Sequence, residues 1–193
     1  MASLVAALED LTPCDPDDAL VAAALDQREA FGELYDRYMP RVYRYLVTRS
    51  ATQEEAADLT QHVFLKALDA LPKYRPGRAP FAAWLFRIAR NAATDAHRRR
   101  RPTVSLYDLP AAAPDVNGHG PEAAALKDEQ LRRLRTLVAT LDPGKRELLA
   151  LRFAGGLSAR EIAPLVGKRE EAVKKQLTRV LATLKEHYHD ESA

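Results

Sequence analysis

The chain has 193 residues, a formal net charge of +2 and one cysteine, Cys14. A single cysteine excludes a disulfide framework within the chain and a zinc site built from its cysteines. Because no apolar run approaches the roughly 18 residues that span a membrane and no signal peptide is apparent, we expect a cytoplasmic protein without membrane insertion.

Alanine and leucine dominate the composition and no segment indicates paired strands, so we predict an all-α fold. Proline-rich segments divide the chain into a disordered lead-in, a first helical block, a flexible linker and a second helical block, at residues 1–16, 17–101, 102–121 and 122–193. The first block carries 15 Lys/Arg against 11 Asp/Glu and the second 14 against 11, which fits a nucleic-acid partner.

The first block begins with a predicted helix from residue 19 to about residue 38, for which Asp17 is a candidate cap. Pro40 should break or kink this pattern because proline removes a backbone donor. A second helix should then run from residue 41 to about residue 49.

Thr52 and Glu55 have the spacing of a capping box and should start a third helix, which ends before Pro72. Two prolines and a glycine predict a loop over 73–80, which carries one aromatic and three cationic side chains.

One helix should follow over residues 81–101, and its chemistry is divided lengthwise. Its apolar stripe consists of Phe81, Trp84, Leu85, Ile88 and Ala92. Polar side chains fall away from that stripe, at Arg87, Arg90, Asn91 and Asp95, and four arginines end the helix. Arginines beside aromatics suit a protein that holds phosphates and stacks on bases. The alternative is a core helix with a solvated basic face.

The second block should contain helices over 121–141 and over about 143–154, the second with proline in its first turn. Ser158 and Glu161 form another capping box, and Gly167 separates the short helix that they open from a last helix over about 169–188. This order is the helix-turn-helix pattern.

The last helix should bury one stripe and present another to DNA. The inward stripe consists of Val173, Leu177, Val180, Leu181 and Leu184. The outer face consists of Lys168, Glu171, Lys175, Thr178 and Arg179, with Lys174 at its edge. The alternative is an ordinary helical hairpin with a solvated basic face.

Four segments resemble the extracytoplasmic-function (ECF, group IV) RNA polymerase sigma factors. Residues 30–35, 55–64 and 84–91 read AFGELY, EAADLTQHVF and WLFRIARN, which are similar to the family's conserved region 2. Residues 151–163 read LRFAGGLSAREIA and are similar to the start of region 4. The chain departs from the family at Pro164 and over 171–176, where EAVKKQ replaces a GTVKSR-like run. These departures affect which upstream promoter sequence the protein would recognise more than they affect its fold.

The resemblance implies a sigma factor, which lends promoter specificity to bacterial core RNA polymerase and helps to open promoter DNA. The implied contacts on polymerase are the β′ clamp and the β flap. Many members of the family are held inactive by an anti-sigma factor, and the sequence leaves open whether this chain has one. The alternative function is an autonomous helix-turn-helix regulator that binds duplex DNA without polymerase, and a protein that only sequesters a partner fits the two basic blocks less well.

The resemblance also implies three sets of site residues. Polymerase would contact Glu54, Glu55, Asp58 and Gln61. The downstream promoter element would contact Tyr74, Arg75, Arg78, Trp84, Arg87, Arg90, Asn91 and Arg98, with Tyr74 stacking on an extruded base. The upstream element would contact Ser158, Lys168, Arg169, Glu171, Lys174, Lys175, Thr178 and Arg179.

Three of these residues have simpler readings. Asp58 could merely solvate its helix, Trp84 fits the core better than a base wedge, and Glu171 could face solvent or pair with Lys175 instead of reading a cytosine.

Enzyme motifs are missing from the sequence. The histidines form no HExxH pair, and no Walker loop, GxSxG elbow or GxGxxG segment follows a strand. We therefore expect no catalytic residues, no cofactor and no metal site.

Overall fold

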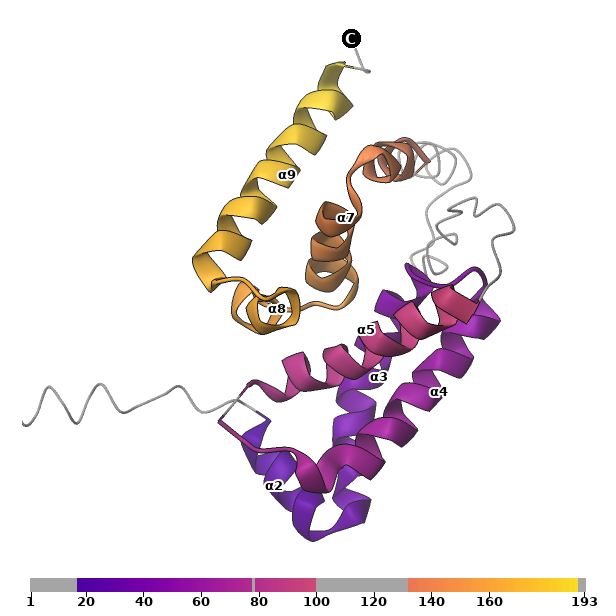
Figure 1. Cartoon of the computed structure of the whole chain (residues 1–193), viewed down its shortest axis with the longest axis vertical. Coiled ribbons are helices and arrows are strands. Elements are labelled where there is room, and N and C mark those ends of the chain that lie inside the picture. Colours follow the sequence, from indigo (N-terminus) through magenta and orange to yellow (C-terminus); the bar gives the residue numbers. More distant parts are fainter. Residues whose placement is uncertain (1–16, 78, 100–131, 191–193) are drawn as a thin grey trace, which may run out of the picture.

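The computed structural model describes residues 17–77, 79–99 and 132–190, with side chains up to Tyr188 (Figure 1). The predicted lead-in over 1–16 and the predicted linker over 102–121 lie outside these residues. Within the described ranges every regular element is a helix, which confirms the all-α prediction. None of these helices is both long and apolar enough to cross a lipid bilayer.

The N-terminal part of the first block differs from its prediction. A helix, α2, spans Asp18–Asp26, a short 3-10 turn, η1, spans Arg28–Ala30, and α3 spans Phe31–Val47. The predicted continuous helix is wrong because Gln27 is extended, with φ of −127° and ψ of 113°. The predicted break at Pro40 is also wrong, since this proline lies inside α3.

Packing explains why α3 continues through its proline. Pro40 itself is exposed, whereas side chains before and after it are buried at helical spacing, at Leu34, Tyr38, Val42, Tyr45 and Leu46. A proline on the solvent side leaves its freed carbonyl within reach of water, and the buried stripe packs both halves of the helix against the core.

Asp17 precedes α2, but its side chain does not cap the helix. The carboxylate is buried, accepts a hydrogen bond from the hydroxyl of Tyr38 and pairs with Arg37. Asp17 therefore fastens the start of the block to α3.

The predicted capping box starts the next helix, α4, over Gln53–Ala70, and a 3-10 turn, η2, follows over Leu71–Lys73. The Thr52 hydroxyl accepts the Glu55 amide at 3.1 Å. The Glu55 carboxylate accepts the amide of Ala51 at 2.9 Å, one residue earlier than in the usual reciprocal pair.

The predicted arginine-rich helix is α5, Phe81–Arg99, and its apolar face is wider than expected. Trp84 and Ile88 are only partly buried, while the side chains at the centre of the face are Ala82, Leu85, Phe86, Ala89 and Ala93. In Figure 1, α3, α4 and α5 pack together as the main bundle of the first block.

The second block has the predicted helix-turn-helix order. Residues 132–140 are helical, α7 spans Pro143–Leu149, and a π-helical segment, η3, spans Ala150–Ala154. The short helix α8, Ala159–Val166, opens with both bonds of the predicted capping box, at 3.3 Å and 2.6 Å. Gly167 makes the turn with φ of 65°, and α9, Glu170–Asp190, is the last helix.

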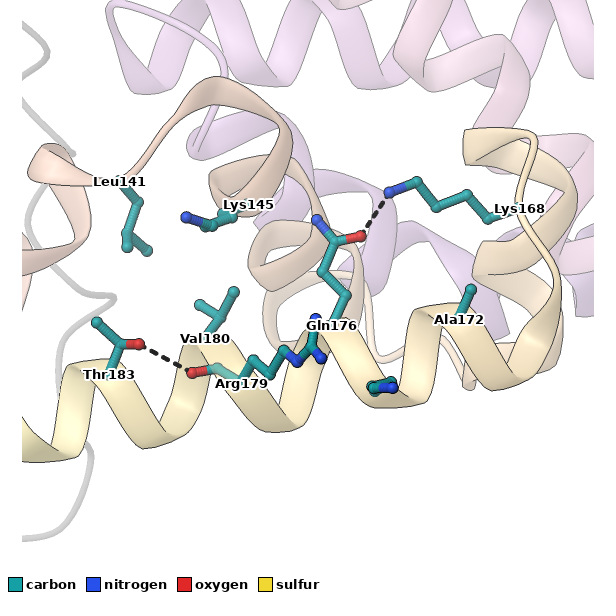
Figure 2. Close-up of a pocket in the computed structure, with 9 residues that line it drawn as sticks. Leu141, Lys145, Lys168, Ala172, Gln176, Arg179, Val180 and Thr183 are labelled. Atoms are coloured by element: carbon teal, nitrogen blue, oxygen red, sulfur yellow. Dashed lines mark hydrogen bonds between the residues drawn. The ribbon is translucent and has the colours of Figure 1, made fainter.

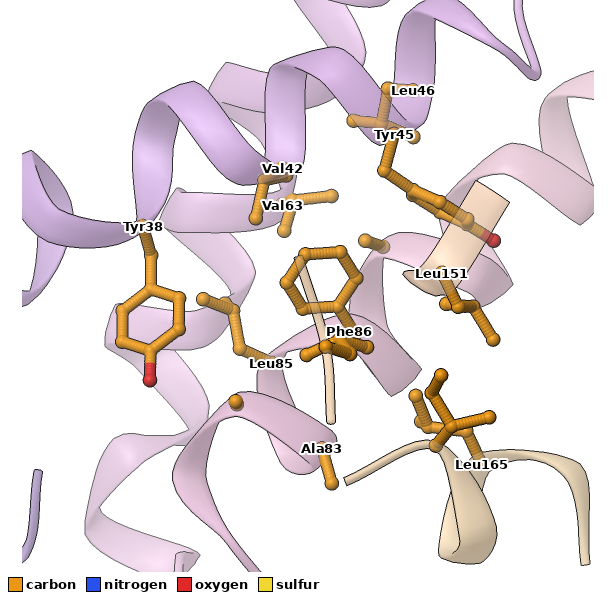
Figure 3. Packing of buried hydrophobic residues seen from close by; sticks show 14 of the residues in the cluster. Tyr38, Val42, Tyr45, Leu46, Val63, Ala83, Leu85, Phe86, Leu151 and Leu165 are labelled. Atoms are coloured by element: carbon orange, nitrogen blue, oxygen red, sulfur yellow. The ribbon is translucent and has the colours of Figure 1, made fainter. Parts of the chain in front are cut away.

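The two blocks share one cluster of buried hydrophobic side chains among the described residues. Phe86 of α5 contacts the ring of Tyr45 from α3, with ring centroids 5.5 Å apart. Leu151 and Leu165 of the second block belong to the same cluster (Figure 3). The second block therefore packs directly against α3 and α5.

Phe86→Ala should destabilise the whole chain, because it opens a cavity where both blocks meet. We expect a loss of about 3–5 kcal/mol in the free energy of unfolding, measured by urea denaturation. Phe153→Ala is the matched control, since Phe153 is 60% exposed and should change stability by no more than about 0.5 kcal/mol. Equal losses for the two variants would contradict this role of Phe86.

Candidate functional site

One face of α4 carries the residues expected to bind polymerase. Glu54, Asp58 and Gln61 are exposed and follow one another at helical spacing. Leu65 extends this face by one turn and is 63% exposed, which sequence analysis missed although its spacing was readable. Glu55 is half-buried, and its bond to Ala51 makes it a cap rather than a member of this face.

The aromatic side chain expected to stack on DNA lies in the core. Tyr74 is 4% exposed, and its hydroxyl donates to the carbonyl of Ala79 at 2.9 Å. Its ring lies 5.7 Å from that of Phe81 and 5.1 Å from that of Trp84, measured between centroids. In this conformation Tyr74 supports Trp84 and offers no face to a base, so the expected stacking role does not fit.

The outer face of α5 brings several of the downstream-element candidates together. Arg87, Asn91 and Arg98 are exposed at spacings of four and seven residues, and Trp84 lies half-buried one turn before Arg87. This line offers amide and guanidinium donors beside the edge of an aromatic ring, which suits an unpaired strand.

Two other candidates come from the preceding loop. The Arg75 guanidinium donates to the carbonyls of Pro72 and Tyr74, both at 3.2 Å, and Arg78 lies outside the described residues.

Arg90 turns away from this line and contacts the second block. Its guanidinium donates to the carbonyl of Leu165 at 3.1 Å and lies 3.4 Å from the carboxylate of Glu147. Glu147, which is 6% exposed, also pairs with Arg49 at 3.0 Å and accepts the hydroxyl of Tyr45 at 2.8 Å. Burial, reinforced by the Glu147 carboxylate, raises the pKa of Tyr45, so the phenol stays a donor.

Sequence analysis missed this contact. The sequence does place a carboxylate, Glu147, beside apolar residues of α7, which hints that it is buried. Its partners could not be identified, because they lie far away in sequence.

Two further arginines of α3 hold the turn after η3. Arg41 donates to the carbonyls of Gly155 and Gly156 at 2.9 and 3.0 Å, and Arg44 donates to that of Ala154 at 3.3 Å. We call Arg41, Arg44, Arg49 and Arg90 the arginine cluster. Each of its members bonds to an acceptor of the second block.

A basic groove of about 550 Å³ lies between α7 and α9 (Figure 2). Its cations are Lys145, Lys168, Lys175 and Arg179, and Lys168 donates to the side-chain amide of Gln176 at 2.6 Å. Three of these cations were predicted from the recognition-helix pattern, whereas Lys145 comes from α7 and was missed. The groove can hold phosphates of a duplex beside the outer face of α9.

The first turn of α9 is acidic and partly neutralised. Lys174 lies 2.9 Å from the carboxylates of both Glu170 and Glu171, and these bonds raise the pKa of Lys174. Glu171 thus pairs with Lys174 rather than with Lys175. The predicted outer face is exposed throughout, including Arg169 and Thr178.

Two of the predicted inward or DNA-facing side chains differ from expectation. Leu181 is 43% exposed, although the other members of the inward stripe are buried. Ser158 caps α8 through its hydroxyl, which leaves it a structural role.

Among the described residues, no three His, Cys, Asp or Glu side chains gather in a way that could hold a metal ion. The α5 and α9 surfaces present donors and cations for macromolecular contacts, whereas the α4 face presents two carboxylates, one amide and an exposed leucine.

Two family models match the chain, Sigma-70 region 2 over residues 34–103 and Sigma-70 region 4 over residues 131–184. The ECF RNA polymerase sigma factor SigD of Mycobacterium tuberculosis is 36% identical over 179 residues, which cover 88% of this chain and 82% of SigD. The ECF RNA polymerase sigma factor BldN of Streptomyces coelicolor is 34% identical over 162 residues, which are 84% of this chain but only 61% of BldN.

A solved structure of CnrH in complex with the cytosolic domain of CnrY has a similar fold. It is 28% identical, with a TM-score of 0.65, and the match covers 91% of this chain and 99% of that one. The two family models together match more than half of the chain, and SigD is more than 30% identical over most of it. The chain belongs to the extracytoplasmic-function family of RNA polymerase sigma factors.

Proposed function

We propose that this chain directs bacterial core RNA polymerase to promoters, with the first block docking on polymerase and opening the downstream element. The second block reads the upstream element as duplex DNA. The observation that carries the proposal is that one chain with sigma regions 2 and 4 presents three separate exposed surfaces, one on α4, one on α5 and one on α9. We place this activity in the cytoplasm, where polymerase acts, and it needs no catalytic residue.

The α4 face is the proposed contact with the β′ clamp. Asp58 and Gln61 supply polar contacts, with Glu54 at the edge, and Leu65 supplies an apolar side chain that a partner can bury. Interfaces gain most of their free energy from a few buried anchors surrounded by polar contacts, which this face can provide. The second block would contact the β flap.

The outer face of α5 is the proposed site for the opened downstream strand. Asn91 offers donors and an acceptor to an extruded base, while Arg87 and Arg98 hold phosphates. Trp84 is a half-buried aromatic side chain one turn before Arg87, and the ring of the buried Tyr74 packs against it at 5.1 Å between centroids.

The groove between α7 and α9 is the proposed site for the upstream duplex. Lys145, Lys175 and Arg179 are exposed or half-buried cations that can contact phosphates along one strand. Glu171 lies near the start of the recognition helix, the part that contacts base edges in helix-turn-helix proteins, but its carboxylate already has Lys174 as a partner.

A regulatory protein partner is a second proposal, supported by the likeness to CnrH, whose solved structure contains the cytosolic domain of CnrY. A partner of this kind would act as an anti-sigma factor for this chain by occupying surfaces that polymerase or DNA needs.

The combined change Asp58→Ala and Gln61→Ala should weaken binding to core polymerase about tenfold, because it removes contacts worth about 1.4 kcal/mol. Transcription in vitro with bacterial core polymerase and a promoter library, together with pull-down on core, measures both activity and docking. Asp36→Ala, an exposed carboxylate on α3, is the matched control. A wild-type chain that starts transcription from no promoter would contradict the proposed function, and undiminished pull-down of the double variant would contradict the docking face.

Tyr74→Ala and Asn91→Ala should have different defects, the first in stability and the second in promoter opening. Loss of the buried Tyr74 ring should lower the free energy of unfolding by about 3 kcal/mol and reduce transcription from duplex and pre-melted promoters alike. Asn91→Ala should leave stability within about 0.5 kcal/mol and reduce opening of duplex promoters, with partial rescue on a pre-melted bubble. Thermal melts and permanganate reactivity report these effects, and a stable Tyr74→Ala chain with an opening defect alone would contradict the structural role.

Glu171→Ala should leave the preferred upstream sequence unchanged, because the carboxylate is engaged with Lys174 on the exposed side of α9. Affinity for all sequences should rise slightly, since a negative charge near phosphates is removed. Selection of upstream elements from a randomised pool by the holoenzyme, with wild type and variant, measures the preference, and titration of one fixed promoter with each holoenzyme measures the affinity. Relaxed preference at one position, by about 1–3 kcal/mol, would show instead that Glu171 reads a base.

A further inference from the structure

A second cavity, which we call the crevice, has a volume of about 340 Å³ and is lined by residues of both blocks. It is distinct from the basic groove, with which it shares only Lys168 and Gln176. A cavity of this size lies at the lower end of the range that small-molecule sites occupy. The three surfaces that we assign to polymerase and DNA leave the rest of its lining unused.

The crevice has an excess of positive charge. Arg49, Arg90 and Lys168 line it, and Glu147 is the carboxylate among them. The charge of Glu147 is shared by Arg49 at 3.0 Å and Arg90 at 3.4 Å. Because a guanidinium carries several N–H donors in a planar fork, both arginines keep donors for a further acceptor. A phosphate group, with its two negative charges and several acceptor oxygens, fits such a set of donors.

Lys168 and Gln176 hold each other in a defined arrangement beside these arginines. The Lys168 ammonium donates to the side-chain oxygen of Gln176 at 2.6 Å (Figure 2). The amide nitrogen of Gln176 therefore keeps both of its donors, and the ammonium keeps the rest of its own. Donors that are already oriented lose less side-chain entropy when an anion binds.

Glu147 adds a requirement that a simple anion does not meet. The residue is 6% exposed, and its Oε2 lies 3.0 Å from the Arg49 guanidinium, yet no donor among the described residues is aligned with Oε2 for a hydrogen bond. A buried acceptor without a hydrogen bond is costly, so a ligand hydroxyl that donates to this oxygen would be favoured. Apolar lining comes from Pro143, Leu148 and Val166, against which the ring of a ligand can pack.

We propose that the crevice binds a small phosphorylated molecule of the mononucleotide class, with its phosphate on the cations and Gln176, a sugar hydroxyl on Glu147 and its ring against the apolar lining. Inorganic phosphate can make only the first of these contacts, and a nucleoside only the other two. The inference goes beyond the proposed function and does not depend on it. A bound ligand would stabilise the folded chain, because the crevice exists only when the chain is folded.

The test titrates the full-length chain with AMP, GMP, CMP and UMP in separate calorimetric experiments. Ionic strength is held constant, since a basic surface attracts any anion. We expect saturable binding of at least one of the four, with one nucleotide per chain and a raised melting temperature. The matching nucleoside and inorganic phosphate should each bind at least about tenfold more weakly, because each lacks part of the contacts. Saturable binding of none of the four, or inorganic phosphate that binds as tightly as the nucleotide, would overturn the proposal.

Two matched variants locate the site. Arg90→Gln removes a cation that lines only the crevice and should weaken binding of the nucleotide at least about tenfold. Lys175→Gln removes a cation that lines only the basic groove and should change binding by no more than about twofold. An equal loss for the two variants would place the ligand in the groove and overturn the assignment to the crevice.

A third variant keeps the test available if Arg90→Gln does not fold by circular dichroism. Val166→Trp fills part of the crevice without changing any charge, so it should also weaken binding at least about tenfold. Undiminished binding to a folded Val166→Trp chain would contradict the site. These experiments contain neither polymerase nor promoter, so their failure would reject this inference and leave the proposed function to be judged by transcription.

Discussion

The contact between the two blocks depends on the absence of a side chain at Gly155. A Cβ atom there would lie 2.8 Å from Cε1 of Phe86 and 2.8 Å from the carbonyl oxygen of Leu151, which is closer than real Cβ contacts. Because the backbone can approach the Phe86 ring, the carbonyls of Gly155 and Gly156 reach Arg41, and Glu147 reaches the first block. A larger residue would push the blocks apart or bend the turn, and the polar contacts would be lost with the apolar one.

Local chemistry made much of this fold predictable, and long-range packing explains the errors. Ser158 and Glu161 form the capping box that their spacing predicts, because such bonds involve only neighbouring residues. The prediction of two helices separated at Pro40 was wrong, because nothing in the local sequence shows that the flanking side chains are buried against α4 and α5. The prediction for Tyr74 has a related cause. An aromatic side chain in a proline-rich loop is expected to be exposed, and the sequence does not show that Phe81 and Trp84 pack against this one.

The same difference between local spacing and long-range packing decides which residues of the candidate surfaces could be predicted. Helical spacing was enough to place Asp58, Gln61 and Asn91 on exposed faces. It could not show that Arg90 contacts Glu147, because these residues meet only when two blocks from distant parts of the chain pack together. The resemblance to a family identifies tasks for each region, but a cation's partner in the free chain depends on tertiary contacts that no motif contains.

The double pairing of Lys174 affects how strongly upstream binding responds to ions in solution. A cation that already lies between Glu170 and Glu171 adds little net positive charge near a phosphate. Each phosphate neutralised by a protein cation releases about 0.9 condensed counterions from duplex DNA. Lys145 of the groove is likewise paired, with Asp142 at 3.0 Å, so Lys168, Lys175 and Arg179 account for most of the ion release that the groove can produce. Its hold on the upstream element would persist over a wider range of ionic strength than the number of basic residues on α9 implies.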